Sequence, residues 1–146
     1  MAPAAPLDPV SRLLHRVNYS ETDQMGVAYH ARYVVWLDMA RTEHLRRTGY
    51  SYADLEASGL LLAVGELTIR YRFPARYDDL VAVRCWVREV ASRRITFGYA
   101  IERDGTGELL ATASTAMLAV DRSFTITRLP DHVRHLLVTC ADPVRL

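Results

Sequence analysis

The feature that most constrains the fold of this chain is a period-two alternation of apolar and polar residues through its second half. Every other side chain is apolar in residues 67–73, and residues 81–87 and 95–101 repeat this pattern. Such alternation is typical of strands with one covered face. Residues 104–105, Asp-Gly, predict a hairpin loop, after which residues 109–120 are apolar or small on both faces. We expect four successive antiparallel strands, the last of them covered on both sides.

A long helix is predicted ahead of these strands. Residues 31–48 carry large or apolar side chains at the three-four spacing of one helical face, namely Tyr33, Trp36, Leu37, Ala40 and His44. Gly49 marks the end, because glycine readily takes the left-handed conformation just beyond a helix. With about 18 residues, the helix would span roughly 27 Å.

Three shorter elements complete the predicted order. Residues 13–19 form a first strand, residues 51–57 form a short helix capped by Ser51, and Pro130 opens a short terminal helix in its first turn. The order of strand, long helix and four antiparallel strands predicts an α+β fold. Laying the helix across the apolar face of one sheet is the economical packing.

Length and charge bound the domain organisation. Three prolines in the first nine residues predict a flexible lead-in over residues 1–10, followed by a single domain over residues 11–146. The 18 basic and 17 acidic side chains leave a formal charge of +1, so we expect no nucleic-acid partner. No window is long and apolar enough for a membrane span, no secretion signal is apparent, and two cysteines do not make a disulfide framework. A cytoplasmic protein is the expectation.

The chemistry is concentrated in the loop before the long helix, residues 19–30, which reads YSETDQMGVAYH. Asp23 supplies an acid or base, and Gly26 permits close approach of a substrate to the backbone. The first amides of the helix offer N–H groups and a positive dipole to a developing oxyanion. These parts suffice for acyl transfer. In the alternative interpretation, Glu21, Thr22 and Asp23 only cap a helix and decorate a loop.

Other catalytic schemes find less support. The chain has no Gly-x-Ser-x-Gly elbow, and residues 105–107 form a hairpin turn rather than a dinucleotide-binding loop. His132 and His135 could share a helix face, but no third or fourth ligand accompanies them. We therefore expect no metal.

Two stretches of the sequence resemble the 4-hydroxybenzoyl-CoA thioesterase/YbgC family. They are RVNYSETDQMGVAYHARY at residues 16–33, continued by DMARTE at 38–43, and YRFPARYDDL at 71–80. The resemblance implies a hotdog fold, in which an antiparallel sheet of five or more strands wraps around one long central helix. It also implies an acyl-CoA thioesterase that needs no cofactor, since coenzyme A is part of the substrate. Family members form homodimers, often paired into homotetramers, with active sites between subunits.

The resemblance also assigns roles within the loop. By position, Asp23 matches the family's catalytic acidic residue, and His30 stands at the helix start whose backbone N–H polarises the thioester carbonyl. The His30 side chain and Tyr19 match positions implicated in the YbgC branch. Asp38 stands where many relatives have Glu, a change expected to affect support of the site rather than its chemistry.

The remaining candidates concern substrate binding, and each has a structural alternative. Tyr29 and Tyr33, with Gly26, are predicted to line the acyl site, although aromatic residues at helical spacing also suit core packing. Arg93 and Arg94 suit the phosphates of coenzyme A, or are solvated arginines in a turn.

The mechanism and the function each leave alternatives. Asp23 could attack the acyl carbon and form a mixed anhydride, or deprotonate water, and the sequence does not separate the two. Rival functions are a non-catalytic acyl-CoA-binding hotdog module, a thioesterase for acyl-carrier-protein substrates, and a hotdog hydratase or dehydratase. The last of these needs a differently placed acid and His pair.

Overall fold

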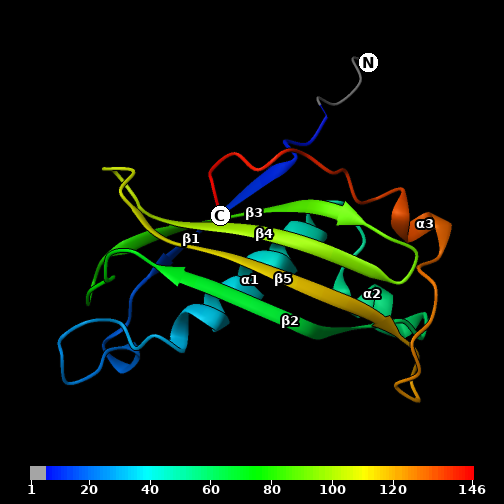
Figure 1. Cartoon of the computed structure of the whole chain (residues 1–146), viewed down its shortest axis with the longest axis horizontal. Helices are drawn as coiled ribbons and strands as arrows, with labels where there is room; N and C mark the ends of the chain where they lie inside the picture. Colours follow the sequence, from blue (N-terminus) through cyan, green and yellow to red (C-terminus); the bar gives the residue numbers. More distant parts are fainter. Residues whose placement is uncertain (1–5) are drawn as a thin grey trace.

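A computed structural model describes residues 6–146 as one antiparallel sheet with a helix against one face (Figure 1). The strands lie in the order β1-β3-β4-β5-β2. Their bounds are β1 Val10–Arg16, β2 Leu61–Tyr71, β3 Leu80–Val90, β4 Arg94–Arg103 and β5 Leu109–Val120. The helices are α1 Arg32–Arg46, α2 Tyr52–Ala57 and α3 Asp131–Arg134, and residues Tyr19–Glu21 form a single 3-10 turn. The predicted five-stranded antiparallel sheet is confirmed.

The edge strands of the sheet are β1 and β2, and each pairs with a strand that is not its neighbour in the sequence. Successive strands β3, β4 and β5 are neighbours, whereas β2 pairs with β5 and β1 pairs with β3. Leu61 at the start of β2 faces Val120, and Arg94 at the start of β4 faces Leu118. The β3–β4 turn therefore lies at the same end of the sheet as the start of β2, and the end of β2 lies at the other.

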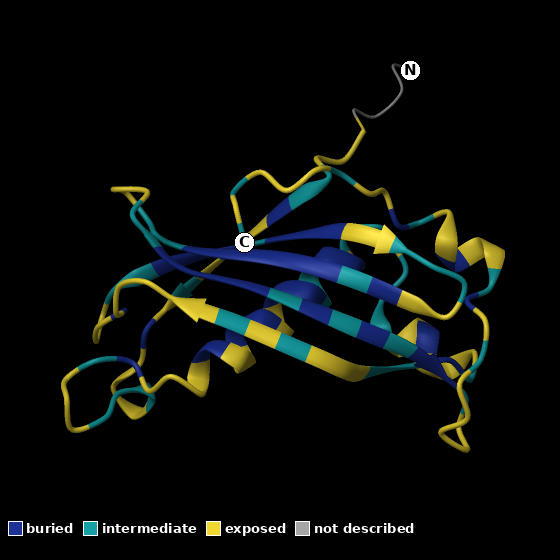
Figure 2. Cartoon of the chain, in the orientation of Figure 1, coloured by how far each residue is buried: buried dark blue, intermediate teal, exposed yellow. Residues whose placement is uncertain are grey.

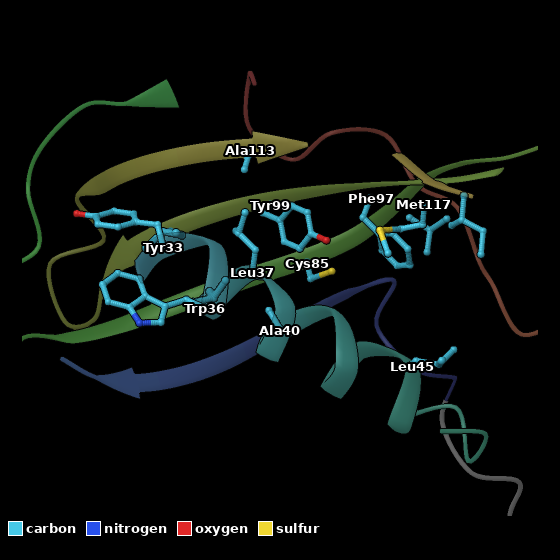
Figure 3. Packing of buried hydrophobic residues seen from close by; sticks show 14 of the residues in the cluster. Tyr33, Trp36, Leu37, Ala40, Leu45, Cys85, Phe97, Tyr99, Ala113 and Met117 are labelled. Atoms are coloured by element: carbon cyan, nitrogen blue, oxygen red, sulfur yellow. The ribbon is translucent and has the colours of Figure 1, made fainter. Parts of the chain in front are cut away.

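The core lies between α1 and the inner face of the sheet. Figure 3 shows side chains of α1 directed at the strands, and Figure 2 shows that the buried residues of α1 face the sheet while its exposed ones face away. The residues in contact are Tyr33, Trp36, Leu37, Ala40 and Leu45 of α1, and Cys85, Phe97, Tyr99 and Met117 of the strands. Complete burial of one large apolar side chain stabilises the fold by about 1.5–3 kcal/mol, so this face holds the helix in place.

Several predicted boundaries were wrong. The long helix has 15 residues rather than 18, and it begins at Arg32. The first strand runs from Val10 to Arg16 rather than over 13–19, because Val17 donates its N–H to Asp79 and the chain then enters the 3-10 turn. The short helix capped by Ser51 is confirmed, with a hydrogen bond from the Asp54 N–H to the Ser51 side chain. Pro130 is the N-cap of α3 rather than a residue of its first turn.

Residues 1–5 of the predicted lead-in lie outside the described residues, and β1 already begins at Val10. Among the helices of residues 6–146, none has the length and apolar character to cross a membrane.

Candidate active site

Asp23 begins a tight hairpin in the loop between β1 and α1. An isolated bridge pairs Thr22 with Ala28, the Asp23 N–H donates to the Val27 carbonyl at 3.0 Å, and the Gly26 N–H donates to the Asp23 carbonyl at 3.0 Å. Gly26 has φ +78°, a left-handed conformation that glycine adopts without strain. The Met25 N–H donates to Oδ1 of Asp23 at 2.8 Å. One carboxylate oxygen is thus bound to the turn, and Oδ2 makes no hydrogen bond within residues 6–146.

A cavity of about 260 Å³ opens beside this carboxylate. Three of the predicted site residues, Asp23, His30 and Tyr33, line it together. The rest of the lining comes from the loop and from the end of β2 with the residues after it, namely Met25, Val27, Ala28, Tyr71, Arg72, Phe73 and Pro74. An acid therefore lies in a largely apolar pocket, which is the arrangement expected for a site that binds an acyl group.

His30 lies just before α1 rather than at its first residue. The helix begins at Arg32 with Ala31 as N-cap, one residue later than the predicted start at Ala31, so His30 directly precedes the N-cap. The N–H groups of His30 and Ala31 make no hydrogen bond within residues 6–146, whereas the His30 carbonyl accepts a hydrogen bond from the Tyr71 hydroxyl at 2.7 Å. A fixed backbone with a free N–H beside the pocket can donate to an oxyanion.

Tyr33 serves both the core and the pocket. Its side chain is buried, its ring packs against Trp36 and Tyr71 at centroid distances of 4.6 and 5.1 Å, and its hydroxyl accepts a hydrogen bond from the Ala75 N–H at 3.0 Å. Burial raises the pKa of this hydroxyl, so Tyr33 is a neutral wall of the pocket. Tyr33 therefore has both of the roles that the sequence left open, in core packing and in lining the pocket.

The other predicted site residues are not among those that line the cavity. Tyr19 is 74% exposed and packs edge-on against Tyr77, 5.5 Å away. Gly26 shapes the turn, and Tyr29 is half-exposed beside the ring of His30. Arg93 and Arg94 are exposed at the turn between β3 and β4, at the opposite end of the sheet from the Asp23 loop (Figure 1).

Glu21 is the residue of this region whose role sequence reasoning missed. Its carboxylate accepts hydrogen bonds from the Trp36 indole, from His15 and from the Asn18 N–H. Burial acts to raise the pKa of Glu21, but these hydrogen bonds outweigh it and lower the pKa below its ordinary value. The spacing Asn-x-x-Glu at residues 18–21 is a capping-box pattern and was the available signal.

Metal ligands are not gathered near this pocket. Within residues 6–146, no group of three or more His, Cys, Asp or Glu side chains is arranged to hold a metal ion.

Comparison with known proteins places the chain in a family. A family model described as "Thioesterase-like superfamily" matches residues 17–137. The putative acyl-CoA thioesterase YneP of Bacillus subtilis is 35% identical over 113 residues, which are 77% of this chain and 81% of YneP. The acyl-CoA thioester hydrolase YbgC of Escherichia coli is 34% identical over 106 residues, 73% of this chain and 78% of YbgC. The solved DHNA-CoA thioesterase of Staphylococcus aureus superposes with a TM-score of 0.76 at 32% identity, over 82% of this chain and 79% of that one.

These matches and the fold define a thioester hydrolase of the hotdog class. The chain belongs to the thioesterase-like superfamily, with a sheet of the kind found in hotdog thioesterases.

Proposed function

We propose that this enzyme hydrolyses acyl-CoA thioesters to a free acid and coenzyme A in the pocket beside Asp23. The observation that carries the proposal is the common lining of one largely apolar cavity by Asp23 and His30. A thioester carbonyl is already electrophilic, so the enzyme needs only to position a carboxylate or water in line and to stabilise the oxyanion. The names of YneP and YbgC support the class of substrate.

Asp23 is the proposed nucleophile or general base. As a nucleophile its carboxylate attacks the acyl carbon, coenzyme A leaves as the thiolate, and water then hydrolyses the mixed anhydride. As a base it takes a proton from a water that attacks the same carbon. The free Oδ2 supports either role, because Oδ1 is held by Met25.

The backbone N–H of His30 is the proposed oxyanion donor. Its neighbouring carbonyl is tied to Tyr71 at 2.7 Å, which limits movement of this peptide segment. A preorganised donor costs little reorganisation during the reaction and is worth several kcal/mol in comparable sites, about 2.7–4 kcal/mol. The side chains of His30 and Tyr19 are proposed to orient the substrate, with Tyr19 acting from the rim.

The acyl group is proposed to lie against Tyr33 and the apolar residues around it. Phe73 and Met25 are 55% and 77% exposed in the single chain, and both line the cavity. Exposed apolar side chains at the mouth of a pocket suit an apolar ligand. Gly26 and Tyr29 would contact the substrate where it enters.

A second copy of the chain is proposed to complete the site. β2 is an edge strand of 11 residues, and its exposed Val64 lines a second cavity together with the exposed Val34 and Val35 of α1. Long uncovered edges are uncommon in isolated proteins, and a two-fold axis would pair two β2 strands antiparallel. Such pairing brings the partner's opposite end, with its Arg93 and Arg94, beside this pocket. Those guanidinium groups would then bind the phosphates of coenzyme A.

In the same pairing, the two α1 helices would lie together at the centre of the assembled fold. The sheets of two copies would then enclose both helices, as the hotdog arrangement implies. Assembly of such dimers into a homotetramer is a further part of the proposal.

The test is release of free thiol from a panel of short, long and aromatic acyl-CoA thioesters, with the same acyl groups also presented on an acyl carrier protein. We expect turnover of at least one acyl-CoA, with kcat/KM for it about tenfold or more above the carrier-protein form. Binding without turnover would favour a non-catalytic acyl-CoA module. Preference for the carrier-protein substrates would favour a thioesterase that acts on acyl-carrier-protein thioesters.

A further inference from the structure

Glu21 joins β1, α1 and the loop between them, and it lies outside the lining of the pocket. Its side chain is 12% exposed, and it is absent from the residues that surround the cavity. The residue lies in the 3-10 turn between β1 and the Asp23 hairpin. A partly buried carboxylate in this place needs hydrogen-bond donors to compensate for its loss of hydration.

Three donors from different elements meet this carboxylate. Oε2 accepts from the Trp36 indole N–H of α1 at 2.6 Å. Oε1 is 2.8 Å from Nε2 of His15 in β1, and it also accepts from the Asn18 N–H at 2.8 Å. Trp36 is fully buried, and the His15 ring lies against it at a centroid distance of 5.3 Å. The carboxylate therefore ties α1 and β1 to the start of the loop.

The backbone of Glu21 extends this connection to both proposed catalytic groups. Its carbonyl accepts from the Tyr29 N–H at 2.7 Å, and the next N–H along the chain is that of His30. The residue after Glu21, Thr22, forms the bridge with Ala28 that closes the hairpin, and Asp23 follows. Asp23 and His30 are thus each within two residues of an interaction that depends on where Glu21 lies.

We propose that Glu21 is a positioning residue for thioester cleavage, which sets the separation of the Asp23 carboxylate and the His30 N–H through its bonds to Trp36, His15 and Asn18. The inference rests on the proposed function of the pocket. Glutamine in its place has nearly the same shape, but it offers one acceptor oxygen and an NH₂ group, so it cannot accept from all three donors. Misplacement of reacting groups by about 1 Å can lower a rate about 10²-fold.

The experiment compares wild type with Glu21→Gln in steady-state thiol release from the best acyl-CoA substrate. We expect kcat to fall about 10- to 100-fold while KM changes less than about threefold, because the substrate-binding walls are untouched. Met117→Ala is the control for general loss of stability, since Met117 is buried at the opposite end of the core from Trp36 (Figure 3). Measured at a temperature where all variants are fully folded, this control should keep the wild-type kcat.

Amide hydrogen exchange supplies the second measurement. In Glu21→Gln we expect faster exchange in residues 22–31, with unchanged protection in β4 and β5. A wild-type kcat in Glu21→Gln, or faster exchange spread evenly through the sheet, would overturn the positioning role. Failure of the proposed function gives a different result: Asp23→Asn would then cleave the substrate as fast as wild type.

Discussion

At the scale of single residues, α1 carries a buried histidine, His44, on the side that faces the core. His44 is 5% exposed, and its Nδ1 lies 2.7 Å from the hydroxyl of Ser11, which itself donates to the Cys85 carbonyl. Burial first, and then the charge of Arg47, lower the pKa of His44 to about 4 from an ordinary value of 6.5. The native state therefore holds this histidine neutral in the core.

This histidine predicts how stability depends on pH. Between pH 6.5 and pH 4 the unfolded chain binds a proton at His44 and the native chain does not. The contribution of His44 to stability is therefore fully present above pH 6.5 and falls as the pH is lowered towards 4. The shift implies a loss of about 2 kcal/mol between pH 7 and pH 5, measurable by urea unfolding. His44→Gln cannot titrate and should lose this part of the pH dependence. An identical pH dependence in both proteins would contradict the assignment.

At the residue scale, the sequence singled out three of the ten residues that line the pocket, but not the contacts that hold them. Asp23, His30 and Tyr33 were predicted and do line one cavity, because the loop and the start of the helix are adjacent in the chain. Glu21 was interpreted only as a possible cap. Its bonds to Trp36 and His15 span 15 and 6 residues, and period and spacing do not reveal contacts of this kind.

At the scale of elements, the C-terminal segment lies along β3 and covers Trp86. Thr139 forms a parallel bridge with Val87, and the Cys140 N–H donates to the Val87 carbonyl at 3.1 Å. Asp142 accepts from the Trp86 indole at 2.9 Å and from the Arg88 guanidinium at 2.9 and 3.0 Å. Burial acts to raise the pKa of Asp142, but the hydrogen bonds from Arg88 and Trp86 outweigh it and lower the pKa.

Asp142→Ala should release this segment from the sheet. We expect Trp86, which is fully buried, to become accessible, so acrylamide quenching should increase and the emission maximum should move to longer wavelength. Loss of a charge-assisted pair that also satisfies a buried indole should cost about 1–3 kcal/mol in urea unfolding. Asp104→Ala, which removes a more exposed pair with Arg12, is the matched control and should cost less than about 1 kcal/mol. Equal effects of the two variants would refute this role for the segment.

Element boundaries were predicted less well than element types. The alternation placed β3, β4 and β5 correctly, but β2 begins at Leu61, several residues before its regular alternation starts. Its irregular beginning coincides with a shift of register between Val64 and Glu66, where a bulge breaks the period of two. The C-terminal segment along β3 had no periodic signal, because it is held by side-chain bonds from Asp142 and by single backbone contacts.

At the scale of the whole molecule, the arginines proposed to bind phosphate lie far from the proposed catalytic acid, and for this reason a second copy is part of the proposed function. Arg93 and Arg94 lie at the end of the sheet away from Asp23. Contacts between subunits leave no periodicity in a sequence. For this reason the oligomer was predicted only by the family resemblance.

Val64→Asp tests the proposed pairing through β2. Val64 is 53% exposed and lines a cavity with Val34 and Val35 of α1, so a carboxylate there would be buried without a partner at the proposed contact. By sedimentation velocity we expect wild type to be at least dimeric and Val64→Asp to dissociate towards monomer, with loss of thiol release. Arg46→Asp, which changes an exposed residue at the far end of α1, should leave assembly intact. A monomeric wild type with full activity would refute the shared site.

The proposed role of Asp23 in thioester cleavage is tested by kcat for thiol release in Asp23→Asn. Asparagine retains the shape of the side chain and an oxygen for the Met25 N–H, so the hairpin should fold as before. Removing the nucleophile or base predicts a kcat about 10²- to 10⁴-fold below that of wild type on the same acyl-CoA. A kcat within about threefold of wild type in the folded variant would contradict this role of Asp23.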